Sequence, residues 1–271
     1  MRLQNRPLVS RFCAIGLLLC VTTLCLSGCG SGGQQAHERY ATLSSAAAAL
    51  SAHVRRETRF QAEAFFRGTN DQVNSSILYS VNGQARCDES EQWASQSYTA
   101  VWLGASSRGE DLFQNNSCVH TENGEETVTE RDTGEALHAF PFRSVWVPAE
   151  TDLANIEAAD GQNGMIYSLT MPGTASVLQD LCGMDWYALA QIREPEKEKE
   201  SVGMLELTYT VSDGIVRSFA AECTVQIFEK AGYTPGYSKP DADGLTLTLR
   251  VQWSYTALDE AVSGPAGLKP T

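Results

Sequence analysis

The chain has 271 residues, with 33 acidic against 20 basic side chains, and its net charge is −13 at pH 7. An acidic balance of this size argues against a nucleic-acid partner and against electrostatic attraction to anionic lipid headgroups. All five lysines lie from Lys197 onward, so the first two thirds of the chain have no lysine-rich patch.

The first 28 residues have the features of an export signal. Three arginines and no acidic residue precede an apolar run over residues 12–26. A helix needs about 20 residues to cross a bilayer, so this run is too short for a permanent span and is typical of a signal peptide. Removing residues 1–28 with their three arginines leaves 243 residues, with 17 basic against 33 acidic side chains and a net charge of −16.

Residues 26–29, Leu-Ser-Gly-Cys, resemble the lipobox of bacterial lipoprotein precursors. The resemblance implies that the thiol of Cys29 receives a diacylglyceryl group and that the chain is cut just before it. Each buried CH₂ of an acyl chain contributes about 0.8 kcal/mol, and two or three chains together anchor a protein stably where one would not. We therefore expect a membrane anchor at Cys29 on the extracytoplasmic face. The alternative is an uncleaved anchor or an ordinary secretory signal with a chance cysteine.

The mature chain begins with a flexible, glycine-containing tether over residues 29–35. A helix is predicted over residues 36–57, because apolar residues recur there at spacings of three and four. These residues are Tyr40, Leu43, Ala47, Leu50 and Val54. We expect one domain over residues 36–261, followed by a disordered tail over residues 262–271.

The middle of the chain is predicted to form hairpins. Alternating apolar residues over 60–66 and 77–81 predict strands, and Asn82-Gly83 after them is a strong hairpin signal. Asn123-Gly124 is a second such signal, between strands predicted over 112–120 and 125–130. The other predicted elements in this part are a strand near residues 98–102, an aromatic strand over 140–146, a short acidic helix after Pro148, and a strand over 165–171 stopped by Pro172-Gly173.

The last third is predicted to consist of a helix and three long strands. The helix covers residues 175–192 and is followed by a charged connector over 194–200. Strands over 205–211 and 215–227 flank an Asp213-Gly214 turn, and a final strand covers 245–255. Their apolar residues alternate with polar ones such as Thr248, which indicates antiparallel strands with one buried and one solvated face.

Four cysteines remain in the mature chain besides Cys29, namely Cys87, Cys118, Cys182 and Cys223. An even number in an exported chain suggests disulfides, and three pairings are possible. The alternative is free, buried thiols.

The order of tether, helix, hairpins, second helix and long one-sided strands resembles the LolA/LppX-like lipoproteins, especially uncharacterised members from Gram-positive bacteria. The resemblance is strongest over residues 207–216 and 246–255. It implies an α+β fold in which a curved antiparallel sheet forms a half-barrel, with helices packed across its concave face and room for an acyl chain or lipid between them. It also implies that Cys182 faces Cys223, and that Cys87 pairs with Cys118 between neighbouring strands.

Signatures of catalysis are missing from the sequence. There is no Gly-x-Ser-x-Gly elbow, no Ser-x-x-Lys motif and no His-Glu-x-x-His pair. The mature histidines are predicted to be surface, loop or strand-edge groups without a metal. They are His37, His53, His120 and His138. We therefore expect no enzyme activity, cofactor or metal; a hydrolase with a dispersed site is the third-ranked possibility.

Two functions from different classes remain open. The first is a membrane-anchored lipoprotein that carries an apolar or lipid ligand. The second is a scaffold or interaction lipoprotein of the cell envelope whose core is filled. Large inward side chains such as Trp253 and Phe219 favour the second, whereas a run of alanine and glycine would favour a cavity.

Overall fold

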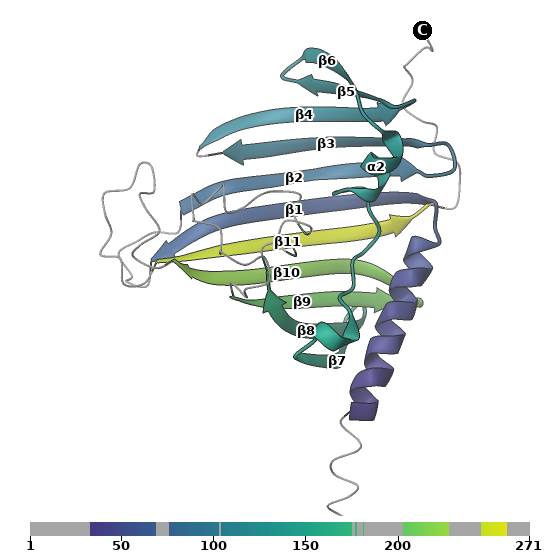
Figure 1. The fold of residues 1–271 in the computed structure, drawn as a ribbon, viewed down its shortest axis with the longest axis vertical. Coiled ribbons are helices and arrows are strands. Elements are labelled where there is room, and N and C mark those ends of the chain that lie inside the picture. Colours follow the sequence, from purple (N-terminus) through teal and green to yellow (C-terminus); the bar gives the residue numbers. More distant parts are fainter. Residues whose placement is uncertain are drawn as a thin grey trace, which may run out of the picture.

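The computed structural model describes residues 33–68, 76–102, 104–174, 177, 181, 203–227 and 245–258. Eleven antiparallel strands form one open sheet in the order β6-β5-β4-β3-β2-β1-β11-β10-β9-β8-β7 (Figure 1). Strands that follow each other in the sequence are neighbours in the sheet, except β6 and β7, which form its two opposite edges. β1 pairs with both β2 and β11. The first and last strands therefore meet in the middle of the sheet. The predicted α+β fold, with an open antiparallel sheet of the half-barrel type, is confirmed.

The strands differ in length, and the central ones are the longest. Their bounds are β1 Arg55–Gly68, β2 Ser76–Asp88, β3 Trp93–Trp102, β4 Ala105–Gln114, β5 Ser117–Glu122, β6 Glu125–Glu130, β7 Asn155–Gly161, β8 Gly164–Gly173, β9 Gly203–Ser212, β10 Ile215–Ile227 and β11 Leu245–Ala257. Between β6 and β7 lie the helix α2, Thr133–His138, and the 3-10 turn η1, Glu150–Asp152.

A helix over residues 33–51 precedes β1 and runs past the strands at the β7 end of the sheet (Figure 1). Leu43 and Leu50 are fully buried, and the Tyr40 hydroxyl donates a hydrogen bond to the carbonyl of Pro148 over 2.9 Å. The helix was predicted to end at residue 57, which was wrong: it ends at residue 51, because the residues from Arg55 onward pair as strand β1. The buried side chain of Arg56 donates to the carbonyl of His53 over 2.7 Å and fixes this transition.

The buried face of the sheet carries a row of aromatic side chains that are register neighbours on five strands. Phe60 lies opposite Trp253, Trp253 opposite Phe219, Phe219 opposite Tyr209, and Tyr209 opposite Tyr167. All five are at most 5% exposed. The alternation predicted for the last strands is confirmed, since buried and exposed residues alternate along β9.

Segment 139–149 covers part of this aromatic row without forming a strand, so the strand predicted over residues 140–146 was wrong. The ring of Phe140 lies 5.2 Å from that of Phe60 and 5.4 Å from that of Trp253, between centroids. The aromatic residues of this segment pack onto the sheet rather than pairing within it, so that Phe142 is buried and Phe140 and Trp146 are partly buried. The short acidic helix expected after Pro148 is the turn η1.

Two of the three predicted hairpin turns are present. Asn123-Gly124 and Asp213-Gly214 each have two consecutive positive φ angles, as a two-residue hairpin turn of this kind requires. Asn82-Gly83 instead lies inside β2, so this prediction was wrong. The sequence analysis also missed a turn at Asn115-Asn116, with φ angles of 55° and 56°, which splits the strand predicted over 112–120.

Several predictions fall outside the described residues. These are the signal over residues 1–28, the first part of the tether over 29–32, most of the second helix, the connector over 194–200 and the tail. Residues 33–35, predicted as the end of the flexible tether, instead form the start of the first helix. Residues 177 and 181 are helical, as predicted. In the described parts of the chain, no helix is long and apolar enough to cross a membrane.

Candidate functional site

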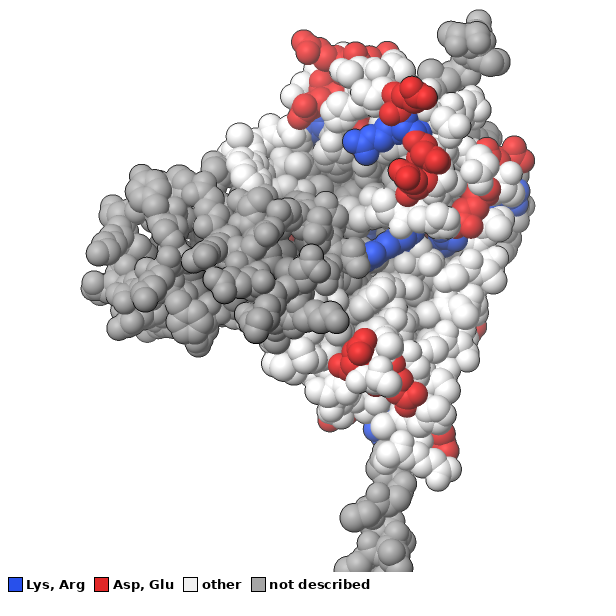
Figure 2. Space-filling view, viewed as in Figure 1, with Lys and Arg blue, Asp and Glu red and all other residues white. Residues whose placement is uncertain are grey.

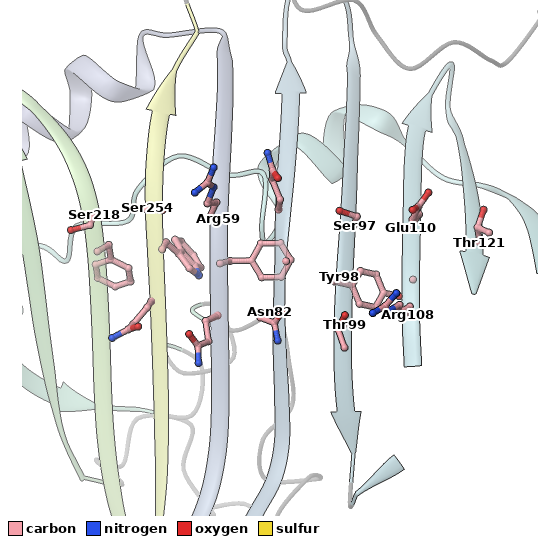
Figure 3. Close-up of a pocket in the computed structure, with 18 of the residues that line it drawn as sticks. Arg59, Asn82, Ser97, Tyr98, Thr99, Arg108, Glu110, Thr121, Ser218 and Ser254 are labelled. Carbon is pink, nitrogen blue, oxygen red and sulfur yellow. The ribbon is translucent and has the colours of Figure 1, made fainter. Parts of the chain in front are cut away.

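The polar face of the sheet, opposite the aromatic row, has a wide hollow of about 1040 Å³ that reaches from β10 to the β5–β6 turn (Figure 3). Most of its strands contribute three consecutive residues, such as Arg59, Phe60 and Gln61 on β1. Phe60 is buried on the opposite face, whereas Arg59 and Gln61 are exposed. The side chains that line the hollow are therefore the outward-facing ones of the central strands.

These outward side chains form two rows that cross the strands. The register places residues of neighbouring strands opposite one another in each row. The first row consists of Ser218, Ser254, Arg59, Gln84, Ser97, Glu110 and Thr121. The second consists of Ala220, Gln252, Gln61, Asn82, Thr99 and Arg108, and it ends at Asn123 in the β5–β6 turn. Hydroxyl and amide side chains predominate, so hydrogen-bond donors and acceptors recur along both rows.

Three charged side chains line the hollow, namely Arg59, Arg108 and Glu110. The Nε atom of Arg59 is 3.7 Å from Oε1 of Glu57, but the other oxygen of Glu57 accepts a shorter hydrogen bond, 2.9 Å, from Arg86. Arg108 makes no ion pair within the described residues. The lining thus carries one net positive charge on a strongly acidic chain, whose acidic side chains gather at the β5–β6 edge of the sheet (Figure 2).

The opposite side of the sheet, between the aromatic row and the segments packed on it, is filled with large side chains in its described part. Trp253 is 2% exposed and contacts the rings of Phe140, Phe219 and Tyr255. The Tyr209 hydroxyl donates to the carbonyl of Trp146 over 2.9 Å, and burial raises the pKa of Tyr209 well above its ordinary value. Bulky inward residues are the feature that distinguishes a filled core from a cavity.

Two buried polar atoms in this core, Nε1 of Trp253 and the hydroxyl oxygen of Tyr255, have no hydrogen-bond partner within the described residues. An unpaired buried polar group is destabilising by about 1–3 kcal/mol. A polar atom supplied from outside the described residues, or by a ligand, would relieve this.

The cysteines do not form the predicted pairs. Cys87 and Cys118 are both buried and free, and they share a row in which Ala94 and Phe113 lie between them. Three strand spacings separate them by about 14 Å, whereas a disulfide needs Cα atoms within about 7 Å. The predicted pairing between neighbouring strands was wrong, because β3 and β4 lie between β2 and β5.

Cys223 is also a free thiol in the structure, and burial raises its pKa to about 12. Its Sγ atom lies close to Gly173 and Gly203, where an added Cβ would meet it at 3.1 and 3.4 Å. Because Cys223 is free, the predicted Cys182–Cys223 bridge is not present in the structure. Cys182 and the predicted lipidation residue Cys29 lie outside the described residues, so acylation of Cys29 stays a prediction.

The four histidines are dispersed rather than gathered into one site. The ring of His37 contacts Glu150 at 3.0 Å, and His138 closes α2. His120 lies 2.6 Å from Asp111, which also accepts from Gln96 over 2.6 Å. No group of three or more metal-ligating residues is found within the described parts of the chain.

A scan against family models and a search of curated proteins found no match. Among solved structures, the chain is similar to LprF from Mycobacterium bovis, with a TM-score of 0.45, 11% identity, and coverage of 84% of this chain and 96% of that one. It is also similar to a beta-barrel-like protein of a domain of unknown function from Brucella abortus, with a TM-score of 0.21, 8% identity, and coverage of 74% and 97%.

Proposed function

We propose that this protein is a membrane-tethered lipoprotein of the cell envelope that binds its ligand, without catalysis, on the polar face of the sheet. Its anchor is Cys29, supported by the lipobox-like residues 26–29. The mature net charge of −16 repels an anionic membrane, so the acyl chains supply the membrane affinity and the folded domain stands away from the surface.

The observation that carries this proposal is the position of the hollow. A large hollow lies on the polar face of the described strands, whereas the described core on the apolar face is filled with aromatic rings. A ligand that met the polar face would find many hydrogen-bonding groups and no buried nucleophile, which fits binding rather than chemistry. The filled core also favours the scaffold or interaction class over a carrier of an apolar molecule.

Carriage of an apolar or lipid ligand is the second candidate. It is favoured by one observation, the two buried polar atoms of Trp253 and Tyr255 that lack a partner within the described residues. A ligand oxygen lying against the aromatic row could accept a hydrogen bond from the indole N–H of Trp253.

The test fills the hollow on one strand. Ser254→Trp places a large side chain in the hollow, and Thr256→Trp places the same side chain two residues further on the same face but outside the lining. Both lipidated proteins are purified from native membranes, and the co-purifying small and polymeric molecules are identified by mass spectrometry.

We expect bound material to be lost from Ser254→Trp and kept by Thr256→Trp. An acyl-chain molecule present equally in both variants would transfer support to the apolar-ligand candidate. Absence of any bound material from the wild type and both variants would favour the scaffold without a ligand and overturn the proposal.

A further inference from the structure

We infer that the ligand of the polar-face hollow is an acidic polysaccharide, a hydroxyl-rich chain that carries carboxylate or phosphate groups. This inference rests on the proposed function and adds the chemical class of the ligand.

The hydroxyl-rich part of the inference follows from the two rows of the lining. Serine, threonine, asparagine and glutamine side chains both donate and accept hydrogen bonds, as sugar hydroxyls do. The first row crosses seven strands, so it extends over about 29 Å at about 4.8 Å per strand spacing. A surface of this length suits an extended polymer that lies across the strands rather than a compact metabolite.

The acidic part follows from the arginines. Arg59 and Arg108 project into the hollow from β1 and β4 (Figure 3). Guanidinium groups recognise carboxylate and phosphate through paired N–H donors. The two arginines lie three strand spacings apart, about 14 Å, and on adjoining rows. They therefore fit anionic groups that recur along a chain better than a single charged headgroup.

Other polymers fit less well. An extended peptide usually adds to a free sheet edge and places alternate side chains in apolar pockets. The hollow instead lies over central strands, whose backbone groups are paired on both sides, and its outward side chains are polar.

The experiment measures the mobility of the full mature protein, with Cys29→Ser to keep it soluble, in gels that contain one polymer each. The polymers are polygalacturonate, which carries carboxylates, phosphomannan, which carries phosphates, and neutral dextran. The test variant is Arg59→Gln/Arg108→Gln. The control is Arg131→Gln/Arg217→Gln, which removes the same charge from two arginines outside the lining that do not contact Arg59 or Arg108. Circular dichroism and the urea midpoint confirm that each variant is folded.

We expect at least one acidic polymer to retard the wild type and the control, and the Arg59→Gln/Arg108→Gln variant to bind at least tenfold more weakly. Dextran should bind more weakly than the acidic polymer, and rising salt should weaken only the acidic interaction. Which acidic polymer binds identifies carboxylate or phosphate as the recognised group.

Equal retardation by dextran, or an acidic polymer that binds the two double variants alike, would overturn the inference. So would no retardation by either acidic polymer. In each of these cases, loss of co-purified material from Ser254→Trp would still support the hollow as the binding site, so the two proposals fail separately.

Discussion

The ring of Phe60 lies directly over Gly83 on the neighbouring strand. A Cβ atom added at Gly83 would sit 2.6 Å from Cζ of Phe60 and 2.4 Å from the backbone oxygen of Ser97. Gly109 has a similar relationship with Tyr98, since a Cβ there would meet the Tyr98 ring at 2.3 Å. Both glycines thus lie inside strands because an aromatic ring occupies the space of their missing side chains.

We expect Gly83→Ala to destabilise the protein by about 1–3 kcal/mol, as overpacking does in other cores. Gly109→Ala should be milder, because only the half-buried Tyr98 ring has to move, whereas Gly83→Ala also meets backbone. Urea unfolding of both variants measures the difference. Gly33→Ala, on an open helix position, is the control. Equal midpoints for Gly83→Ala and the wild type would contradict the close approach.

The last strand should show one sensitive and one tolerant face. Leu249→Ala is expected to lower the free energy of unfolding by about 2–5 kcal/mol, and Val251→Asp to prevent folding, since both residues are at most 3% exposed. Gln252→Ala, on the exposed face, should change it by less than about 0.5 kcal/mol. If Gln252→Ala were as damaging as Leu249→Ala in urea titrations, a second layer would have to cover the polar face.

The alternation of apolar and polar residues along the last strand predicts that Thr248 is exposed and can be substituted freely, but the structure buries it. It is 5% exposed, and its hydroxyl lies 3.0 Å from that of Thr224. We expect Thr248→Ala to destabilise by about 1 kcal/mol, the typical net contribution of a hydrogen bond. Thr224→Ala and the double variant complete a cycle that isolates the pair, and purely additive effects would mean that the two hydroxyls do not interact.

Asp88 should make stability depend on pH. Burial raises the pKa of Asp88, but hydrogen bonds from the Ser90 hydroxyl, from Arg55, and from the amides of Glu91 and Ser90 outweigh it, and the pKa is lowered. A lowered folded-state pKa stabilises above the unfolded value, about 3.9, and that contribution is lost as pH falls through the folded value.

We therefore expect the urea midpoint of the wild type to fall more steeply below about pH 4 than that of Asp88→Asn, which is less stable at pH 7. Asp213→Asn, at an exposed turn, is the control and should follow the wild type. Parallel pH profiles for the wild type and Asp88→Asn would rule out this role for the carboxylate.

The thiols provide a further prediction. Cys87, Cys118 and Cys223 should all react with iodoacetamide in denaturant without reductant, and they should resist it in the native protein at pH 8 because they are buried. Peptide mapping by mass spectrometry counts them. A Cys182–Cys223 bridge would leave Cys223 unmodified until reductant is added, and it would restore the pairing that the resemblance implies.

Acylation of Cys29 is tested by metabolic labelling with an alkyne fatty acid. We expect the wild type to be labelled and Cys29→Ala to remain unlabelled, with the precursor retaining its signal. Equal labelling of Cys29→Ala would assign the acyl group to Cys13, Cys20 or Cys25 in the apolar run instead.

The sequence predicts the last strands well because each has one buried and one exposed face, so the period of two is visible in residues such as Leu207 and Tyr209. The hairpin turn predicted at Asn82-Gly83 is wrong because the dipeptide Asn-Gly, which is typical of two-residue turns, lies inside a strand here. Gly83 is needed in the strand because the ring of Phe60 covers it. The strand predicted over residues 140–146 is wrong because aromatic residues become buried both when they belong to a strand and when a loop packs them onto a sheet. The sequence alone does not distinguish these two cases.

The polar-face hollow could not be predicted in the same way. Arg59 and Arg108 are distant in the sequence, and only the register across β1, β2, β3 and β4 places them on adjoining rows. The available signal was weaker: the outward positions of several strands are serine, threonine, asparagine or glutamine rather than lysine or glutamate.

The pairing of β1 with β11 has a consequence for the order of folding. The first described strand lies at the centre of the sheet, and one of its two partners is the last described strand. While the chain is still being synthesised, β1 can pair with β2, but its other edge stays open and the Phe60–Trp253 neighbours cannot form. The sheet can therefore be completed only after residues 245–257 have been made, so its two halves are joined last.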